Sequence, residues 1–298
     1  MITFEIKKDY SLSTLTSWQI GGQAEYFCSP KNITEIRQAY EWAHENQFPV
    51  TLLGGGSNVL VSDLGVKGLV ISLRSFSGLE VIDDQKYLEI KAYSGTGKSD
   101  LLKVFLKYKV PAALFLSGLP GDLGGGVVMN AGVSENIQPR EFCEIIDWIH
   151  VLKPNGEIQK YSHKDIHWEY RKSKGWQPGI VVEVGIKVPL VTDPEILNKV
   201  REANRQRLSK QPLDLPSCGS VFKNPEGHKA AQLIDQCGLK GKRIGDAQVS
   251  LKHANFIVNL NQATAKDTWE LIQLVRAEVK QRTSVELNPE VVRLGEWP

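Results

Sequence analysis

The residues best suited to chemistry lie in one segment, Ser217 to Pro225, with the sequence SCGSVFKNP. Ser220 precedes Lys223 by three positions, which satisfies a bare S-x-x-K pattern for a nucleophilic serine. The G-x-S-x-G pattern is broken, because Phe222 stands where its second glycine would be. Two roles therefore stay open for Ser220, a nucleophile or a proton donor, and we favour the proton donor.

Two glycine-rich segments are candidates for anion binding. Leu53 is followed by Gly54, Gly55 and Gly56, and a second run extends over 118–126. Glycine lets backbone N–H groups approach an anion closely, because it has no Cβ. A single run of this kind is more often a tight turn. Two runs, each followed by an asparagine, favour a diphosphate that is held from two sides.

Other nucleotide-binding patterns fail. Neither run is G-x-G-x-x-G between a strand and a helix, so a Rossmann site is not predicted. The segment from Gly95 to Ser99 resembles the end of a P-loop, but Ala92 stands where the first glycine is needed, and we interpret the match as chance. His163 and His167 have a spacing that could hold a metal on a helix, but no third ligand is apparent, so no metal is predicted.

The bulk properties exclude several classes of protein. The 298 residues carry a net charge of +2, which gives no basic surplus for nucleic acid. No apolar run is long enough to span a membrane, and the N-terminus has no secretory signal. The four cysteines form no C-x-x-C pair, so we expect neither a zinc site nor disulfides. A reduced, cytoplasmic protein is predicted.

Hydrophobic periodicity and turn residues predict an α+β fold. A polar, glycine-free stretch begins at Asp193 and marks a domain boundary. The predicted helices cover 33–47, 98–108, 193–209, 228–236 and 265–282, and 117–132 is predicted to be a loop. The predicted strands cover 49–53, 68–73, 86–93, 179–188, 244–249, 255–259 and 290–294, with a hairpin over 145–161.

Several short motifs together resemble one family. They are Thr16 to Gly22, Gly54 to Asn58, Gly118 to Gly121 with Asn130 to Gly132, Tyr170 to Ser173, Pro216 to Pro225, and Ile244 to Ser250 with His253. In this order they resemble the UDP-N-acetylenolpyruvoylglucosamine reductases, flavoenzymes of peptidoglycan precursor synthesis. The likeness runs nearly end to end, and the Ser-Cys-Gly-Ser sequence is similar to the second type of that family.

The resemblance implies a fold and a reaction. The fold is a two-subdomain FAD-binding domain of the vanillyl-alcohol-oxidase type over 1–192, divided near 75, followed by a substrate-binding α+β domain over 193–298. The reaction is the reduction of an enolpyruvyl ether by FAD, bound non-covalently, with NADPH as the reductant. The resemblance implies that Ser220 donates the proton, while Arg171 and Glu290 stabilise the anionic intermediate.

The resemblance also implies binding residues, and we expect a monomer. Arg293 follows Glu290 by three positions, where the family has an arginine after two, so no role is predicted for Arg293. Cys218 is expected to pack rather than to bind flavin. The expected cofactor contacts are Ile20, Gly54, Gly55, Gly56, Ser57, Asn58, Val59, Leu60, Gly118, Pro120, Gly121, Gly124, Gly125, Asn130, Ala131 and Gly132. The expected substrate contacts are Tyr170, Lys223, Asn224, Gln248 and His253.

Two other functions compete with this one. A flavin oxidase or dehydrogenase would share the FAD-binding fold, but it needs a base at the substrate carbon rather than the set of Ser220, Arg171 and Glu290. A catalytically inactive sensor of nucleotide sugars would require the loss of one of these residues, and all three are present.

Overall fold

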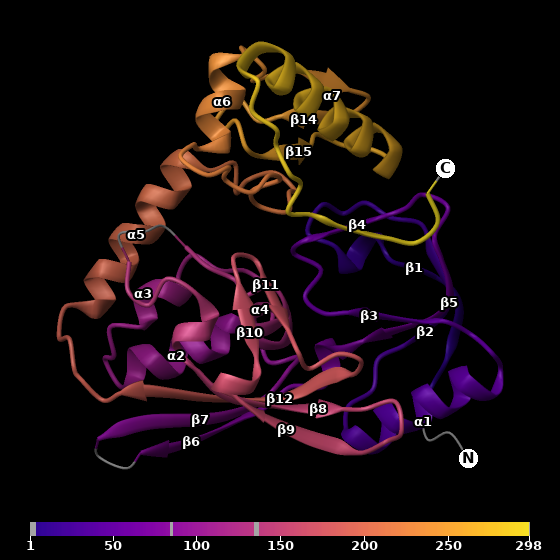
Figure 1. The fold of residues 1–298 in the computed structure, drawn as a ribbon, viewed down its shortest axis with the longest axis vertical. Coiled ribbons are helices and arrows are strands. Elements are labelled where there is room, and N and C mark those ends of the chain that lie inside the picture. The colour runs from indigo at the N-terminus through magenta and orange to yellow at the C-terminus, as the bar shows by residue number, and fades with distance from the viewer. Residues whose placement is uncertain (1–3, 84–85, 134–136, 298) are drawn as a thin grey trace. The chain divides into compact units, whose positions relative to one another are not determined.

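The computed structural model describes residues 4–83, 86–133 and 137–297 (Figure 1). By its contacts the chain forms two compact units, each built from segments that are distant in the sequence. Unit 1 contains Cys28–Gly55 and Ile71–Gln206. Unit 2 contains Ile6–Phe27, Gly56–Val70 and Arg207–Pro298.

These units are not the predicted domains, because residues 6–27 and 56–70 group with the C-terminal part of the chain. A unit defined by contacts need not coincide with a ligand-binding domain. The boundaries of the FAD-binding and substrate-binding domains therefore stay a prediction.

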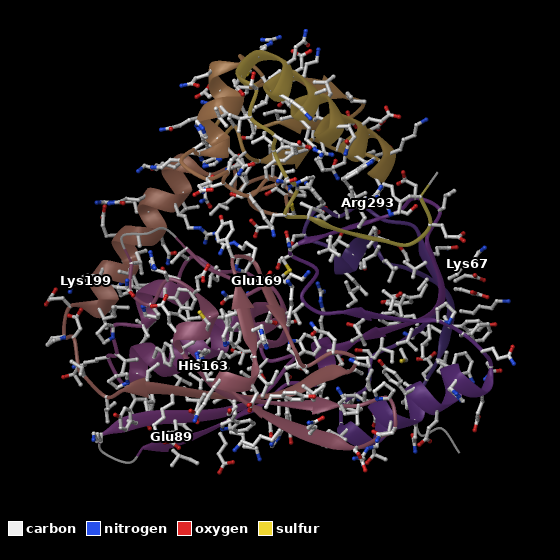
Figure 2. The ribbon with its side chains drawn as sticks, viewed as in Figure 1. Lys67, Glu89, His163, Glu169, Lys199 and Arg293 are labelled. Carbon is white, nitrogen blue, oxygen red and sulfur yellow. The ribbon has the colours of Figure 1, made fainter. Side chains whose placement is uncertain are left out.

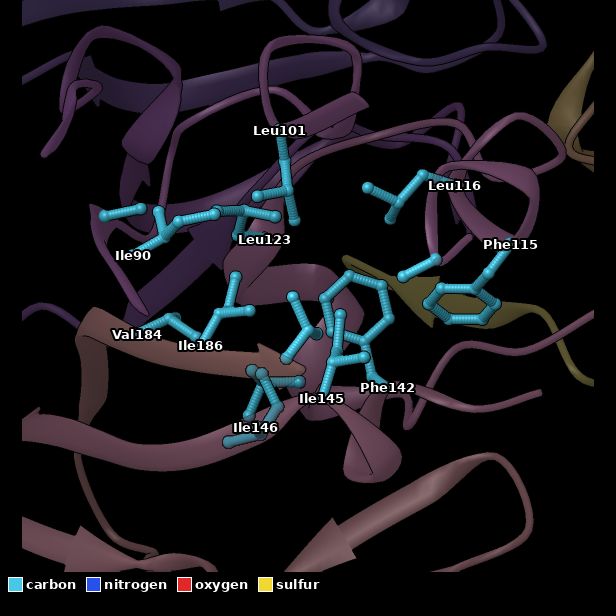
Figure 3. Packing of buried hydrophobic residues seen from close by; sticks show 14 of the residues in the cluster. Ile90, Leu101, Phe115, Leu116, Leu123, Phe142, Ile145, Ile146, Val184 and Ile186 are labelled. Atoms are coloured by element: carbon cyan, nitrogen blue, oxygen red, sulfur yellow. The ribbon is translucent and has the colours of Figure 1, made fainter. Parts of the chain in front are cut away.

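Unit 1 is built on an antiparallel sheet of five strands in the order β6-β7-β12-β8-β9. Side chains alternate between the faces of a strand, and in β7 (Tyr87–Tyr93) Leu88, Ile90 and Ala92 are buried. They pack in one cluster with apolar residues of the helices α2 and α4, such as Leu101 and Leu123 (Figure 3). This packing fixes the second glycine-rich segment on the sheet.

The remaining elements of unit 1 surround this core. Its other strands are β3 (Val50–Leu53), β6 (Leu79–Asp83), β8 (Ile146–Leu152), β9 (Ile158–Ser162), β10 (His167–Glu169), β11 (Lys172–Lys174) and β12 (Ile180–Pro189). Its helices are α1 (Ile33–Glu45), α2 (Lys98–Lys107), α3 (Ala113–Leu116) and α4 (Leu123–Val128), with short 3₁₀ turns at Leu73–Ser75, Phe142–Glu144 and His163–Asp165. Helix α5 (Ile196–Lys210) begins in unit 1 and ends in unit 2.

Unit 2 packs two helices with a small antiparallel sheet, in the order β13-β14-β15. Helix α7 begins with a capping box, in which Thr264 and Asp267 satisfy each other's backbone N–H groups. Its helices are α6 (Ala230–Gln236) and α7 (Ala265–Thr283), and its short strands are β13 (Arg243–Ile244), β14 (Ala247–Val249) and β15 (Ile257–Asn259).

Two further pairings shape unit 2. The strand β1 (Lys7–Ser11) pairs antiparallel with β2 (Gln23–Cys28), which neighbours β5 (Val66–Ser72) in the same sheet. The C-terminal strand β16 (Val292–Leu294) lies parallel to β4 (Val59–Val61). This second pairing ties the end of the chain to the segment that follows the first glycine run.

Most predicted elements are confirmed within a few residues, including all five helices. The prediction of one strand over 244–249 is wrong, because a turn divides this segment into β13 and β14, which pair antiparallel. The prediction of a loop over 117–132 is wrong, because α4 forms inside it. Asp122 caps this helix by accepting a hydrogen bond from the Gly125 N–H group, at 2.7 Å. In the described part of the chain, no helix is both long and apolar enough to cross a membrane.

Candidate active site

Ser220 is exposed on a segment whose neighbours are held firmly in unit 2. Cys218, Val221 and Phe222 are buried around it. The buried side chain of Asn255 clamps Phe222: its Oδ1 accepts from the Phe222 N–H group at 3.0 Å, and its Nδ2 donates to the Phe222 carbonyl at 2.8 Å. The backbone therefore presents the Ser220 hydroxyl from a fixed support.

Glu290 lies beside this segment. Its N–H group donates to the carbonyl of Val221 at 2.8 Å, and the Asn58 side chain donates to the Glu290 carbonyl at 3.1 Å. Burial first, and then the charge of Glu290, raise the pKa of the Cys218 thiol well above its ordinary value. We call Asn58, Ser220, Val221 and Glu290 the serine cluster. The structure thus brings together one predicted cofactor contact and two predicted catalytic residues.

The Cys218 thiol is unsuited to covalent chemistry. A thiol with a raised pKa holds little of the reactive thiolate. Cys218 is also 6% exposed and belongs to the apolar cluster of unit 2. This placement agrees with the expected packing role.

Arg171 lies in unit 1, in the two-residue turn between β10 and β11. Its φ of 58° is in the left-handed region, and its side chain is only 13% exposed. The guanidinium donates to the Gly132 carbonyl at 3.1 Å and lies 4.7 Å from the centre of the Tyr170 ring. Arg171 is therefore a half-buried, fixed cation that contacts Gly132 of the Asn-Ala-Gly motif, and not the solvated arginine of a charged run.

A carboxylate and an amide hold this arginine in place. Glu141 Oε1 lies 3.5 Å from Arg171 Nη1, and its Oε2 accepts from Asn130 Nδ2 at 2.9 Å. Asn130 also donates to the carbonyl of Glu169, which precedes the turn, at 3.1 Å. Asn130 thus fixes both the carboxylate and the turn. Glu141 was not predicted as a site residue, and its only signal in the sequence is an acid that follows the Asn-Ala-Gly motif.

The two glycine-rich segments meet inside unit 1. A Cβ atom added to Gly55 would lie 2.7 Å from the Cα atom of Gly121, and one added to Gly54 would lie 2.5 Å from Asp122 Oδ2. Any side chain at these positions would push the segments apart. The close backbone approach fits the predicted binding of a diphosphate from two sides.

The glycines of α4 serve packing. The N–H groups of Gly124 and Gly125 donate to the Ser94 carbonyl and to the Asp122 side chain. A Cβ atom on Gly124 would lie 2.8 Å from Ser94 Cβ. The N–H groups of Asn130 and Ala131 likewise donate to carbonyls of α4. The N–H groups of these predicted cofactor contacts are therefore already hydrogen-bonded within the protein. The residues can still shape a cofactor site, because they let the backbone segments pack closely.

Comparison with known proteins places the chain in a family. A model of the UDP-N-acetylenolpyruvoylglucosamine reductase C-terminal domain matches residues 211–294, and a model of an FAD binding domain matches residues 24–162. The reductase of Synechococcus sp. (strain JA-3-3Ab) is 40% identical over 98% of this chain and 92% of its own. The chain belongs to the UDP-N-acetylenolpyruvoylglucosamine reductase family. It is thus an FAD-dependent oxidoreductase, as predicted.

Comparisons with other members of the reductase family support the same assignment. The reductase of Staphylococcus aureus (strain COL) is 38% identical over 99% of this chain and 94% of its own. The crystal structure of the reductase from Thermus caldophilus has a TM-score of 0.78 and 31% identity, and it covers 99% of this chain and 100% of its own. The predicted fold class, an α+β FAD-binding domain followed by a C-terminal α+β domain, is confirmed.

The remaining reductase residues predicted for FAD contact differ in exposure. Ile20 and Leu60 are buried in the core of unit 2. Gly56 adopts a φ of 65°, and a Cβ atom there would overlap the Leu15 carbonyl at 1.9 Å. Ser57, Val59 and Gly118 are half-buried. The Pro120 carbonyl accepts a hydrogen bond from Lys98.

The predicted substrate residues of the reductase also make structural contacts. Asn224 Oδ1 accepts from the N–H group of Ala230, the first residue of α6, at 3.0 Å. Gln248 donates to the Gly241 carbonyl at 3.3 Å. Burial lowers the pKa of His253, which favours its neutral form. Lys223 is half-buried next to the serine cluster, and its N–H group donates to the Asn288 carbonyl.

The structure also places His163, His167 and Arg293, for which no site role is predicted. His163 lies in a 3₁₀ turn and His167 in β10, so their spacing does not place them on one helix as a metal pair. The His163 ring stacks on Trp168. Arg293, labelled in Figure 2, lies against two rings, 4.2 Å from the centre of Trp269 and 5.2 Å from that of Trp297.

Proposed function

We propose that this chain reduces the enolpyruvyl group of UDP-N-acetylenolpyruvoylglucosamine to give UDP-N-acetylmuramate, with NADPH as the reductant. Membership of the reductase family supports the substrate class. The observation that carries the proposal is the serine cluster, in which the backbone of Glu290 is bonded to the residue after Ser220. The cytoplasmic location and the monomeric state stay predictions.

The reaction needs a hydride and a proton in sequence. Bound FAD, when reduced, supplies the hydride. Its addition to the terminal carbon of the enol ether leaves negative charge on the neighbouring carbon and on the carboxylate. A cation must stabilise this enediolate, and a proton must then reach the neighbouring carbon.

Arg171 is the proposed cation. A guanidinium stays charged at any working pH and presents a planar fork that matches a carboxylate. The contacts of Arg171 with Gly132, Glu141 and Tyr170 support this role, because a fixed charge costs little reorganisation when the anion forms. Tyr170, which is 47% exposed, is the proposed wall on the substrate side.

Ser220 is the proposed proton donor, and Glu290 assists at the carboxylate of the substrate. A hydroxyl is a weak acid, but the carbanion is a strong base, so the transfer needs no histidine. Glu290 would act in a protonated or proton-sharing form, because a second anion would repel the substrate. Lys223 and Asn224 are proposed to polarise the hydroxyl or to bind the substrate diphosphate, with Gln248 and His253 as further contacts.

The glycine segments are the proposed diphosphate site of FAD. The close approach of Gly54 and Gly55 to Gly121 and Asp122 supports this assignment. Arg171 contacts the carbonyl of Gly132, another predicted cofactor contact, which follows the second segment in the chain. A cation would therefore stand next to the proposed cofactor loops.

The test is the dependence of NADPH oxidation on the enolpyruvyl nucleotide. We expect the purified, FAD-loaded protein to oxidise NADPH rapidly only when the nucleotide is added, with one equivalent of UDP-N-acetylmuramate formed. A protein that binds FAD but oxidises UDP-N-acetylmuramate with oxygen would instead be a flavin oxidase. A colourless protein that cannot be reconstituted with FAD would refute both activities.

A further inference from the structure

Two buried charged residues lie behind the two glycine segments. Lys98 and Asp122 are each 5% exposed. Lys98 belongs to the segment that resembles a P-loop in sequence, and its N–H group donates to the Gly121 carbonyl at 3.0 Å. Its Nζ donates to the Pro120 carbonyl at 2.8 Å and lies 5.2 Å from the centre of the Phe142 ring. The ammonium group is thus fixed directly beneath the second segment.

Asp122 connects the two segments from the same side. Its Oδ1 accepts from Gly125, the Gly55 N–H group faces the carboxyl group, and Oδ2 lies where a Cβ atom on Gly54 would be. Among the described residues, Oδ2 has no hydrogen bond of ordinary geometry. Burial raises the pKa of the Asp122 carboxyl group, and the nearby charge of Lys98 opposes this rise. A buried carboxylate is costly unless an opposite charge is near. It would also repel an anionic ligand at the same loops.

The charged groups that face Asp122 are Lys98, from α2, and Arg74, from the 3₁₀ turn after β5. Arg74 donates to the carbonyl of Gly55 at 2.8 Å and is exposed to solvent, which screens its charge. Asp122 is the charged group that faces Lys98. Lys98 is therefore the buried counter-charge of Asp122.

We propose that Lys98 is a positioning residue of the cofactor site, whose ammonium group balances Asp122 so that the two glycine segments can accept the anionic diphosphate of FAD. This inference rests on the proposed FAD site. Without the ammonium group, the Asp122 charge acts on the diphosphate through a poorly screened interior. This role also explains why Lys98 is buried although its P-loop-like segment is a chance match. Its ammonium group acts on the second glycine segment and does not bind a separate nucleotide.

A double-mutant cycle on Lys98 and Asp122 tests the proposal through the affinity for FAD, without any measurement of activity. The dissociation constant of FAD is measured by flavin fluorescence for the wild type, Lys98→Met, Asp122→Asn and the double variant. Lys98→Met is expected to weaken FAD binding on the order of tenfold or more. Asp122→Asn keeps an acceptor for Gly125 and is expected to bind within about threefold of the wild type. Lys103→Met, at an exposed lysine of the same helix, is the matched control.

The double variant distinguishes an electrostatic role of Lys98 from a purely structural role. If charge balance is the cause, Lys98→Met with Asp122→Asn restores binding close to that of Asp122→Asn alone. Equal weakness in Lys98→Met and the double variant would overturn the proposal and leave Lys98 with a purely structural role. Wild-type affinity in Lys98→Met would overturn it as well.

The affinity of the wild type for FAD can also be measured as a function of pH, a test that does not require Lys98→Met to fold. Burial lowers the pKa of Lys98 to about 8. We therefore expect FAD binding to weaken as the pH rises through about 8, and to weaken much less in Asp122→Asn. The same pH dependence in both proteins would contradict the inference. Failure of the wild type to bind FAD at any pH would instead refute the proposed FAD site.

Discussion

At the scale of single residues, the structure explains why Arg171 and Ser220 differ from ordinary surface residues. Arg171 is aimed by a turn in the left-handed region and by three contacts. Ser220 is exposed, but buried neighbours and Asn255 fix its backbone. A charged or polar group that is fixed in advance stabilises developing charge better than one that must reorganise.

Arg171→Lys is expected to lower the turnover number about 10²- to 10³-fold, because the lysine keeps the charge but loses the planar fork. The visible spectrum of bound FAD should not change. Steady-state kinetics with the enolpyruvyl nucleotide provide the measurement. Arg140→Lys, at an exposed arginine nearby, is the control and should retain full activity. A turnover number of Arg171→Lys within threefold of the wild type would remove Arg171 from the mechanism.

At the scale of elements, the periodic helices and strands could be predicted, because the spacing of their apolar residues is preserved in the fold. Asn32 and Glu35 mark the start of α1 in the sequence, and they bond to each other in the structure. The short helix α4 could not be predicted from its three glycines, since glycine disfavours helix and the packing of Gly126 on Phe142 depends on a residue outside the segment. The strands β1, β2, β4, β6, β10 and β11 were not predicted either.

The C-terminal strand β16 shows how the place of a residue in the fold can explain the role of its side chain. Arg293 stacks on Trp269 of α7 and on Trp297, so its side chain holds the end of the chain to that helix. The shift in spacing after Glu290 thus has a structural explanation. Sequence alone could show the shift but not the rings.

Arg293→Ala is expected to lower the free energy of unfolding by about 1 kcal/mol, through the loss of two cation–π contacts at an exposed site. The turnover number should stay within twofold of the wild type. Urea denaturation and steady-state kinetics measure the two effects. Arg293→Lys should recover part of the stability. A large loss of activity with unchanged stability would show that Arg293 contacts the substrate instead.

At the scale of the whole molecule, the family, the fold class and the order of the main elements could be recognised from the sequence. The composition of the two units could not, because residues 6–27 and 56–70 join the C-terminal part through tertiary contacts. The predicted site residues fall into both units. Ser220, Glu290 and Asn58 lie together in unit 2, and Arg171 lies with the glycine segments in unit 1.

The stability of the whole chain should depend on pH through Lys98. Its pKa is lowered from 10.5 to about 8 by burial. Between these values the unfolded state binds more protons than the folded state, so the free energy of unfolding rises with pH. Relative to Lys98→Met, we expect the apo wild type to gain up to about 3 kcal/mol between pH 7.5 and 10.5.

Denaturant unfolding at these pH values measures the gain, with Lys103→Met as the control at an exposed lysine. The control should follow the wild type. A parallel pH dependence in the wild type and Lys98→Met would show that Lys98 keeps an ordinary pKa in the folded chain.

The most direct test of the account follows the two half-reactions of Ser220→Ala under anaerobic conditions, with Ser217→Ala as the control. NADPH should bleach the flavin of Ser220→Ala at the wild-type rate. Formation of UDP-N-acetylmuramate from the reduced enzyme should then be slower by about 10²- to 10⁴-fold, because the proton donor is missing. Product formation at the wild-type rate in Ser220→Ala would contradict the central claim that Ser220 delivers the proton.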